Sequence, residues 1–351
     1  MTKLVIPHSR PWITEADRYA VERVLNSGLV ANGDKVKEFE AGISDYLGVR
    51  HTVAQSCGTA ALILGLRTLE ITQGDEVILP TYVCRSVLEA VLTIGASPVP
   101  CEVNDRGVIT ADTVAPNITG KTKAIIAAHI FGNPCSIERL KIFGVPVIDD
   151  ACQALGLSLD GKMAGSLGDI GIVSFHATKC LTTGEGGMLV TNNPVWAERA
   201  RHFAEGSVKP ATRSAAPLSD LQASLGISQL ERYNDFLLRR QELRYQYNAT
   251  AKALGLEIGN SDQSDMIFRF TFRTEQKFEL VAAAFRDFGI IVRRGVDELL
   301  HRTLGLNDVG YPTAVRLYQQ TISVPFYPSL SINESRVVTN AFRTLNNGLG
   351  N

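Results

Sequence analysis

The sequence lacks the features that mark several classes of protein. None of the apolar runs in its 351 residues approaches the roughly 20 residues that span a bilayer. The formal net charge is only −1, so no overall attraction to nucleic acid or to an anionic membrane is expected. The stretch from Met1 to Trp12 does not combine a basic region with an apolar segment, as a secretory signal would. We therefore expect a protein of the cytoplasm that binds neither nucleic acid nor membrane.

Cysteine is scarce, and its spacing is not that of a metal site. No two cysteines form a C-x-x-C pair, so neither a zinc site nor a disulfide framework is predicted. Scattered cysteines without a predicted disulfide framework fit a protein of a reducing compartment. We expect most of the thiols to be small core residues, and no neighbouring histidine marks any of them as a nucleophile. The six are Cys57, Cys84, Cys101, Cys135, Cys152 and Cys180.

What the sequence does have is an alternation of short apolar runs and helical patterns. A chain of 351 residues exceeds the about 100–200 residues of one ordinary domain, so two domains are expected. The order of strand and helix signals in the first half predicts an α/β fold, with a mainly parallel sheet between helices. The seven runs with strand character are residues 51–54, 76–79, 97–99, 124–128, 145–148, 170–175 and 187–191.

The character of the chain changes in its second half. Residues 218–254 have the amphipathic pattern of one or two long helices. In residues 267–274, apolar and polar residues then alternate as in a strand. Residues 276–288 have the pattern of a helix, and residues 290–293 have that of a second strand. We expect a large α/β domain over residues 1–235 and a small α+β domain over residues 236–351.

Lys179 stands in a stretch that resembles a ligand site. It follows an apolar strand and precedes the glycines at 184, 186 and 187, and sheets of this kind bind ligands beyond the carboxyl ends of their strands. A lysine attacks a carbonyl only when it is neutral, and a Schiff base with pyridoxal phosphate removes its charge. By itself, the segment fits a solvated lysine beside a glycine-rich turn equally well.

Two further strand ends carry suitable groups. The strand before Asp149 and Asp150 ends in these two acids, and pyridoxal phosphate needs a carboxylate at its ring nitrogen; we choose Asp150, while Asp149 fits a helix N-cap or points away. The turn at Gly58, Thr59 and Ala60 opens a helix, whose first N–H groups bind phosphate well. An amine, a carboxylate and a phosphate cradle at successive strand ends are together what this cofactor requires.

The order and spacing of these motifs resemble a known family. The chain is similar to the sugar aminotransferases of the DegT/DnrJ/StrS group, which have the fold of the aspartate aminotransferase superfamily, fold type I. The resemblance extends over nearly the whole chain. The matching motifs are Ser27-Gly28, Cys57-Gly58-Thr59-Ala60-Ala61-Leu62, Gly74-Asp75-Glu76-Val77, His129-Ile130-Phe131-Gly132, Asp149-Asp150-Ala151-Cys152-Gln153-Ala154, Ser174-Phe175-x-x-x-Lys179, Gly184-Glu185-Gly186-Gly187 and Leu221-Gln222-Ala223.

The resemblance implies a role for each of these residues. Lys179 would hold the cofactor as a Schiff base and shuttle the proton, and Asp150 would contact the pyridinium nitrogen. Gln153 would contact the ring or its hydroxyl, while the Gly58–Ala60 turn and Ser174 would bind the phosphate. In the family, glutamate or glutamine converts the cofactor to pyridoxamine phosphate, which aminates a keto sugar that is usually linked to a nucleotide. A homodimer with sites at its subunit interface is also implied.

The chain departs from the family pattern in three places. Cys84 stands where family members carry an aromatic residue that stacks on the cofactor, so either this sulfur packs on the ring or Tyr82 takes over. Residues 215–217, Ala-Ala-Pro, stand where an asparagine reaches into the neighbouring subunit's site, and Arg213 is a speculative substitute. Ala60 replaces a frequent serine, which removes a hydroxyl from the phosphate cradle.

Other residues are candidates for the site, and two other functions fit the sequence. Arg85 and His301 are candidate substrate contacts together with Tyr82, although Arg85 fits a solvated helix charge equally well. A histidine this close to the lysine is more often structural than catalytic, so a structural role is expected for His176. One alternative is another reaction on the same cofactor, such as dehydration, although dehydratases of one type replace the lysine by histidine. The other is a regulatory protein that binds the cofactor without turnover.

Overall fold

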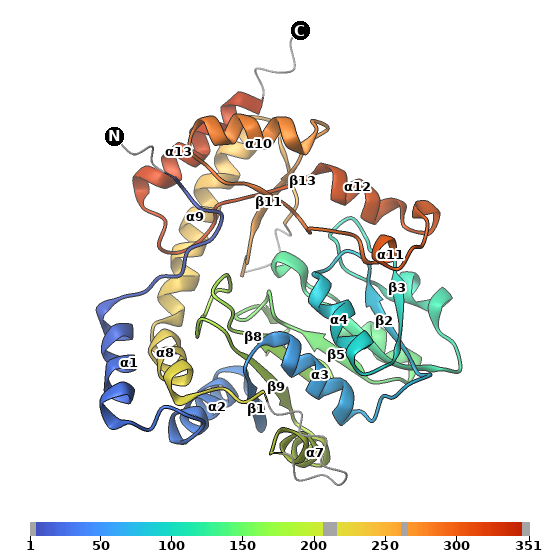
Figure 1. The fold of residues 1–351 in the computed structure, drawn as a ribbon. Helices are drawn as coiled ribbons and strands as arrows, with labels where there is room; N and C mark the ends of the chain where they lie inside the picture. Colours follow the sequence, from blue (N-terminus) through green and yellow to red (C-terminus); the bar gives the residue numbers. More distant parts are fainter. Residues whose placement is uncertain (1–4, 206–215, 261–265, 346–351) are drawn as a thin grey trace.

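A seven-stranded sheet forms the centre of the larger part of the molecule in this computed structural model (Figure 1). The structure describes residues 5–205, 216–260 and 266–345. The strands lie in the order β1-β9-β8-β5-β4-β2-β3, and all neighbouring pairs are parallel except those with β9. Their bounds are β1 His51–Gln55, β2 Glu76–Pro80, β3 Ser97–Cys101, β4 Thr122–Ala128, β5 Val147–Asp150, β8 Ile170–Ser174 and β9 Gly187–Thr191.

All seven strands predicted for the first half are confirmed, within two residues at each end. The central strands β5, β8 and β9 are buried at every position. Strands covered on both faces read as continuous apolar runs, which is why the sequence revealed them so clearly. The predicted α/β class with a mainly parallel sheet is therefore confirmed.

Helices cover the sheet on both faces. The helices α1 and α2 end where the sequence predicted, at Gly28 and Gly48, whose φ angles of 74° and 66° suit glycine. Cys57 precedes the helix that opens beside the predicted phosphate cradle. The helices of this part are α1 Glu15–Ser27, α2 Asp34–Leu47, α3 Gly58–Thr68, α4 Arg85–Thr93, α5 Ala111–Val114, α6 Ile137–Leu140 and α7 Pro194–Glu205, with a two-stranded hairpin of β6 Ser158–Leu159 and β7 Lys162–Met163.

Two helices occupy the predicted long helical stretch. α8 (Asp220–Glu231) packs on α1 and α2, and α9 (Tyr233–Ala253) extends from the large part to the small one (Figure 1). The small part contains a four-stranded sheet in the order β10-β11-β13-β12. Its elements are β10 Glu257–Ile258, β11 Phe270–Arg273, α10 Phe278–Asp287, β12 Arg293–Arg294, α11 Leu300–Thr303, α12 Pro312–Gln320, β13 Thr321–Val324 and α13 Ile332–Phe342.

The sequence missed β13, which lies inside the small sheet between β11 and β12. It has only four residues and follows α12 directly, so neither its length nor a turn marked it. Its alternating partners, Phe270–Val324 and Phe272–Ile322, place two aromatic and two aliphatic side chains on one face. That face forms the core of the small part together with Phe285 of α10 and Phe342 of α13.

Contacts between distant segments tie the two parts together. Ile6, near the N-terminus, pairs with Ile290 and belongs to the hydrophobic cluster of the small sheet. Leu300 and Leu317, although late in the chain, belong to the cluster of the large sheet. Our division at residue 235 remains a proposal. No helix among the described residues has the length and apolar character needed to cross a membrane.

Candidate active site

The predicted site residues come together at one edge of the large sheet. β1, β5 and β8 end there and the antiparallel β9 begins there, because Gln55 and Ser174 both pair with Gly187. Asp150 lies at the end of β5, one strand further along. Parallel topology therefore gathers the ends of β1, β5 and β8, which are far apart in the sequence.

Lys179 lies in the loop that connects β8 to β9. Its backbone N–H donates to the carbonyl of His176 at 2.8 Å, which closes a turn. The side chain is half-buried, and its Nζ lies 5.1 Å from the centroid of the Phe268 ring. It borders a pocket that Cys84, Asp150 and Gln153 also line. The structure thus brings four of the predicted residues to one small cavity.

Asp149 and Asp150 point to opposite sides, as consecutive strand residues must. Asp150 borders the pocket of Lys179, and its Oδ1 accepts a hydrogen bond from the N–H of Cys152 at 3.0 Å. Asp149 is fully buried, and its Oδ2 accepts from the backbone N–H groups of Gly165 and Leu167 at 2.7 and 3.0 Å. Asp149 is therefore not a helix N-cap, and it points away from the pocket.

His129 completes the surroundings of Asp149. Its Nδ1 accepts the N–H of Cys135 at 2.9 Å, so the proton of the neutral ring is on Nε2. That Nε2 donates to Oδ1 of Asp149 at 2.9 Å. Both side chains are fully buried, and together they fix the loop after β4 to the end of β5.

The predicted phosphate cradle is the first turn of α3. Cys57 precedes this helix, and its Sγ lies 3.4 Å from the N–H of Ala60. A Cβ on Gly58 would lie 2.9 Å from Cβ of Ser174, so only glycine allows this helix to approach the end of β8 so closely. The hydroxyl of Ser174 therefore lies beside a helix start whose first N–H groups have no intrahelical partner.

The segment that departs from the family pattern also reaches this cradle. The carbonyl of Ala216 accepts the N–H of Ser56 at 2.6 Å within the same chain. Ala215 and Arg213 lie outside the described residues. The start of the segment leading to α8 therefore lies directly beside the turn that opens α3.

Cys84 and Tyr82 have different surroundings. Cys84 precedes α4 and borders the pocket with Lys179 and Asp150, and its thiol is open to that pocket. Loss of solvation among the surrounding protein atoms raises the pKa of the Cys84 thiol, although the charge of Lys179 acts in the opposite direction. Tyr82 is buried, and its ring contacts Phe131 with 6.2 Å between centroids. The structure does not bring Tyr82 into the pocket, so of the two residues only Cys84 is placed to face the cofactor ring.

Neither Arg85 nor His301 is brought into this pocket. Arg85 is exposed and forms ion pairs with Glu89 at 2.9 Å and Glu298 at 3.4 Å. His301 is fully buried; its Nδ1 lies 2.7 Å from Oγ1 of Thr81 and its Nε2 lies 3.0 Å from Asp308. Arg85 thus has the contacts of a solvated helix charge and His301 those of a structural histidine. A substrate contact by either residue stays a prediction.

His176 also has a structural arrangement. Its Nδ1 lies 2.8 Å from the hydroxyl of Thr178 and 3.1 Å from that residue's N–H. Its Nε2 lies 3.4 Å from Glu185 across the loop. The ring thus stabilises the loop that carries Lys179.

Sequence reasoning missed a second group of residues around Lys179. They come from the N-terminal segment, from α9 and from the residues just before β11, and they line a cavity on the side of the small sheet. Nothing in the sequence indicates them, because each is an isolated residue in an ordinary helix or strand pattern. The most prominent are His8, Arg240, Phe268 and Arg269.

Pyridoxal phosphate fits the residues present. Its phosphate has a helix N-terminus and a hydroxyl to bind, its ring nitrogen has a carboxylate, and its aldehyde has an amine. A mainly parallel seven-stranded sheet with these groups at its edge defines a class, the enzymes that depend on pyridoxal phosphate. Within that class, the chain belongs to the DegT/DnrJ/EryC1/StrS aminotransferase family, whose model matches residues 11–343. The predicted family, cofactor and enzyme class are thereby confirmed.

Similar proteins match most or nearly all of the chain. GDP-perosamine synthase of Vibrio cholerae is 30% identical over 72% of this chain and 73% of its own. The aminotransferase TlmJ of Streptoalloteichus hindustanus is 30% identical, with a TM-score of 0.93 over 99% of this chain and all of that one. The putative sugar aminotransferase Spr1654 of Streptococcus pneumoniae, in its PLP-form, is 27% identical with a TM-score of 0.92, covering 99% of this chain and 100% of that one. These structures confirm fold type I.

Proposed function

We propose that this aminotransferase moves an amino group from glutamate or glutamine to a keto sugar linked to a nucleotide. The observation that carries the proposal is the single pocket bordered by Lys179, Asp150, Gln153 and Cys84 at the strand ends. The sugar substrate is supported by the relatives, one of which is a GDP-perosamine synthase.

When bound, the cofactor would act as an electron sink, which stabilises negative charge on the carbon that carries the amine. Lys179 would provide the amine that holds the cofactor, and this amine, once free, would move the proton at that carbon. Asp150 would keep a proton on the ring nitrogen, because a carboxylate beside a cation favours the charged form. Loss of Lys179 should therefore abolish turnover, and loss of the Asp150 carboxylate should slow it.

Gln153 is oriented by the backbone. Its Oε1 accepts the N–H of Phe131 at 2.9 Å, so its NH₂ group is left to donate into the pocket. This suits a contact with the hydroxyl of the cofactor ring. The Gly58–Ala60 turn and Ser174 would hold the phosphate at the far end.

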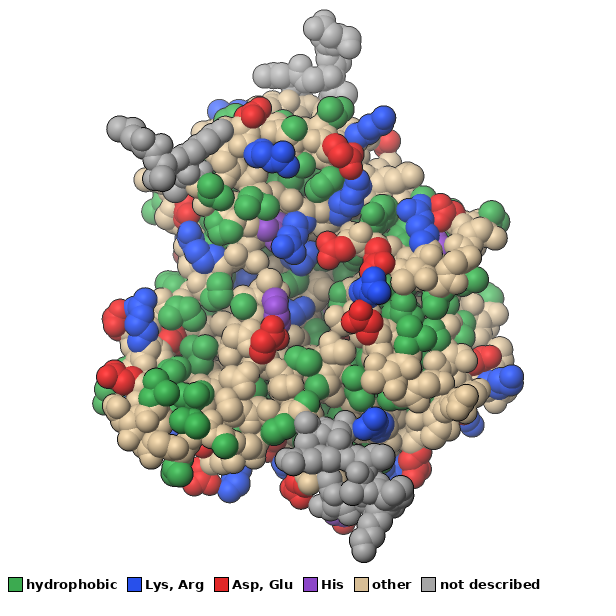
Figure 2. Space-filling view, viewed as in Figure 1, with side chains coloured by type: hydrophobic (Ala, Val, Ile, Leu, Met, Phe, Trp, Pro, Cys, Tyr) green, Lys and Arg blue, Asp and Glu red, His purple; other side chains and the backbone are tan. Residues whose placement is uncertain are grey.

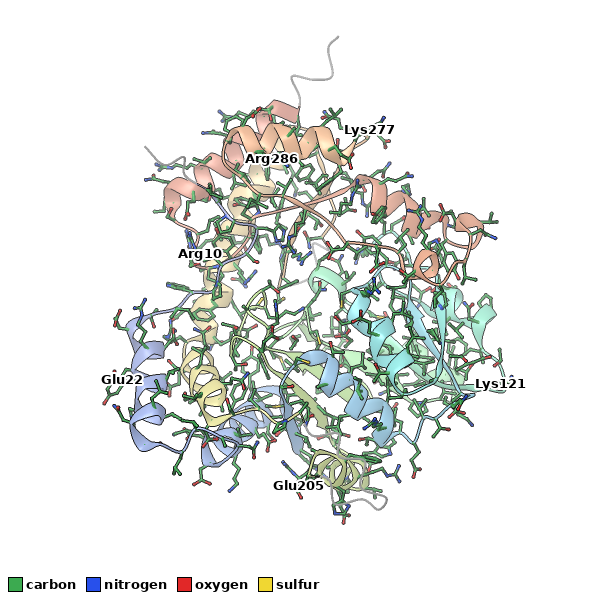
Figure 3. The ribbon with its side chains drawn as sticks, in the orientation of Figure 1. Arg10, Glu22, Lys121, Glu205, Lys277 and Arg286 are labelled. Carbon is green, nitrogen blue, oxygen red and sulfur yellow. The ribbon has the colours of Figure 1, made fainter. Side chains whose placement is uncertain are left out.

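The test is spectroscopic. The purified protein should carry a visible absorption band from the cofactor bound to Lys179, and glutamate should bleach it. Lys179→Ala should lose this response, while Lys121→Ala, at an exposed position far from the site (Figure 3), should keep it. A Lys179→Ala protein that kept both the band and its bleaching would refute the assignment. A wild-type protein whose band responds to no amino donor would favour the regulatory alternative.

We also propose a homodimer. The family is expected to place its sites at a subunit interface, and α1 with the residues that follow it exposes large apolar side chains. Tyr19 is 63% exposed, Leu25 57% and Leu29 75%, and Figure 2 shows hydrophobic side chains gathered over this region. Light scattering after gel filtration should give twice the chain mass, and Leu25→Glu should shift the population toward monomer. A monomeric wild type would refute the proposal.

A cytoplasmic location is proposed from the cysteines. All six are free, although Cys57, Cys84 and Cys152 are partly accessible. Free thiols persist in reducing compartments. Fractionation of the source cells with an antibody to the protein would test this location.

A further inference from the structure

The segment from Thr81 to Cys84 connects β2 to α4 and carries the thiol that borders the pocket of Lys179. A cysteine side chain has one χ1 angle with three staggered positions, so its sulfur stays close to the backbone. An aromatic side chain at the same place would cover a cofactor ring with many atoms. The backbone of this segment therefore decides how Cys84 meets the ring.

A loop of the small part holds this segment. Residues 295–299 connect β12 to α11, and α11 lies beside the residue that follows β2 (Figure 1). The N–H of Leu300 donates to the carbonyl of Thr81 at 3.0 Å. On the surface, Glu298 pairs with Arg85, the first residue of α4, at 3.4 Å. The loop and the start of α11 thus contact both ends of the segment.

His301 adds a buried hydrogen-bond network to this contact. Its backbone N–H donates to Oγ1 of Thr81 at 3.1 Å, and its Nδ1 lies 2.7 Å from the same oxygen. Nε2 donates to Asp308 at 3.0 Å, because a carboxylate only accepts, so the hydroxyl of Thr81 can donate to Nδ1 of the neutral ring. Thr81 and His301 are both fully buried. Separating them would leave buried polar groups without partners, which opposes any movement of the segment away from α11.

Tyr82, the next residue of the segment, is enclosed by both parts of the molecule. An added Cβ on Gly295 of the loop would lie 1.9 Å from the hydroxyl oxygen of Tyr82 and 3.1 Å from its Cζ. On the large part, a Cβ on Gly107 would lie 3.1 Å from Cδ1 of this ring, and the centroid of Phe131 lies 6.2 Å from that of Tyr82. Tyr82 cannot turn away from the loop, so only glycine allows this approach at position 295.

We propose that Gly295 and His301 are positioning residues that hold Cys84 against the cofactor ring. The proposal rests on the proposed function only for the placement of the cofactor in the pocket of Lys179. A gap of about 0.5–1 Å already removes a quarter to a half of a van der Waals contact. A shift of this size between the loop and the segment would therefore separate the sulfur from the ring. The small part thereby sets how firmly the large part retains its cofactor.

The test measures the affinity of the cofactor-free protein for pyridoxal phosphate, without an amino donor or acceptor. Gly295→Ala should weaken binding about 2- to 10-fold, the range for loss of a sulfur–aromatic contact. Adding Tyr82→Phe to this variant should restore the affinity, because it removes the hydroxyl that the new methyl group meets. Gly310→Ala is the matched control, because no atom lies within 4 Å of its added Cβ, and it should bind like wild type.

A double-mutant cycle with Cys84→Ala separates positioning from stability. Because Gly295 acts through Cys84, Gly295→Ala should cause no further loss of affinity in the Cys84→Ala protein. Thr81→Val removes the hydroxyl that contacts His301 with little change in shape, and its effect should depend on Cys84 in the same way. This variant carries the test if Gly295→Ala does not fold. An equal loss of affinity with and without the thiol would overturn the proposal, as would wild-type affinity in Gly295→Ala.

Alkylation of the thiol gives a second readout on the same proteins. Cys84 is exposed, so iodoacetamide should label it, and peptide mass spectrometry would follow the rate. Bound pyridoxal phosphate should slow this labelling in wild type and slow it less in Gly295→Ala. Equal protection in the two proteins would overturn the proposal. A protein that shows these effects but aminates no keto sugar would refute the proposed function and still support the positioning role.

Discussion

Two neighbouring acids show how a single position decides a residue's role. Asp149 and Asp150 are chemically identical and adjacent, yet the pleat of β5 sends them to opposite faces. Asp149 stabilises the fold through His129 and two backbone N–H groups. Asp150 borders the cavity with Lys179. Substitution by the isosteric asparagine should separate the two roles.

Asp150→Asn should reduce the rate of the amino-donor half reaction while the protein still folds. The neutral amide no longer favours a protonated ring nitrogen, and a hydrogen bond to a charged group contributes roughly 1.5–3 kcal/mol, which is about 10- to 100-fold in rate. Stopped-flow bleaching of the visible band by glutamate would measure this. An unchanged bleaching rate would contradict the assignment of Asp150.

Asp149→Asn should instead lower the free energy of unfolding. Removing this buried carboxylate weakens the bonds from Gly165, Leu167 and His129, a loss of about 1–3 kcal/mol. Guanidinium unfolding at pH 7 would measure it against Asp160→Asn, an exposed turn position. A variant as stable as wild type would show that the network around Asp149 contributes little.

At the scale of elements, two helix starts are held by specific contacts, one of them with the first residue of β9. α3 begins against Gly187, where an added Cβ would lie 2.3 Å from the carbonyl oxygen of Cys57. α1 begins with a capping box in which Asp17 accepts the N–H of Thr14. The first contact fixes the phosphate cradle. Asp17 also accepts hydrogen bonds from Ser228 and Gln229, and these fix α1 to α8.

Gly187→Ala should displace the start of α3 and weaken the binding of pyridoxal phosphate. The clash involves backbone atoms that cannot rotate away, and overpacking of this kind costs about 1–3 kcal/mol. Cofactor titration followed by fluorescence would report the loss of affinity. Gly120→Ala is the control, because no atom lies within 4 Å of its added Cβ. Equal cofactor affinity in both variants would contradict the predicted cradle.

Because of Asp17, the packing of α1 against α8 should be sensitive to acid. Burial raises its pKa, but hydrogen bonds from Thr14, Ser228, Arg232 and Gln229 outweigh this effect and lower it overall. A carboxyl with a lowered folded-state pKa stabilises the fold above its unfolded pKa of about 3.9, and this contribution is lost as the pH falls through the folded value. The thermal midpoints of wild type and Asp17→Asn should therefore differ at pH 7 and converge below about pH 4. A difference that does not depend on pH would contradict this.

At the scale of the whole molecule, contacts between distant segments join the two parts. Glu102, just after β3, accepts the N–H groups of Thr313 and Ala314 at 2.7 and 3.1 Å. A carboxylate at a helix N-terminus is favoured by the helix dipole. The start of α12 is therefore held on the large sheet by a residue about two hundred positions earlier in the chain.

Glu102→Gln should weaken the contact between the start of α12 and the large sheet. Losing the charge at the start of α12 should reduce the free energy of unfolding by about 1 kcal/mol. Thermal unfolding would show it, with Glu22→Gln, an exposed position on α1 (Figure 3), as the matched control. If both variants melt at the same temperature as wild type, α12 does not depend on this contact.

The sequence by itself determined the large sheet and the residues at its strand ends. Buried parallel strands are short apolar runs bounded by turns, and the groups that follow them must meet at one edge. For this reason the sequence places Lys179 and Asp150 at one site from local pattern and strand order. The role of Ser174, and the choice of a Schiff-base lysine over a solvated one, rest on the family resemblance as well.

Tertiary structure alone decided which other residues share that space. Tyr82 and Cys84 are two positions apart, and only the packing of α4 shows that Cys84 borders the cavity while Tyr82 lies in the core. Arg269 and Arg240 reach Lys179 from elements tens of residues later in the chain. Such contacts depend on how the small sheet packs on the large one. The local periodicity of a sequence does not predict this packing.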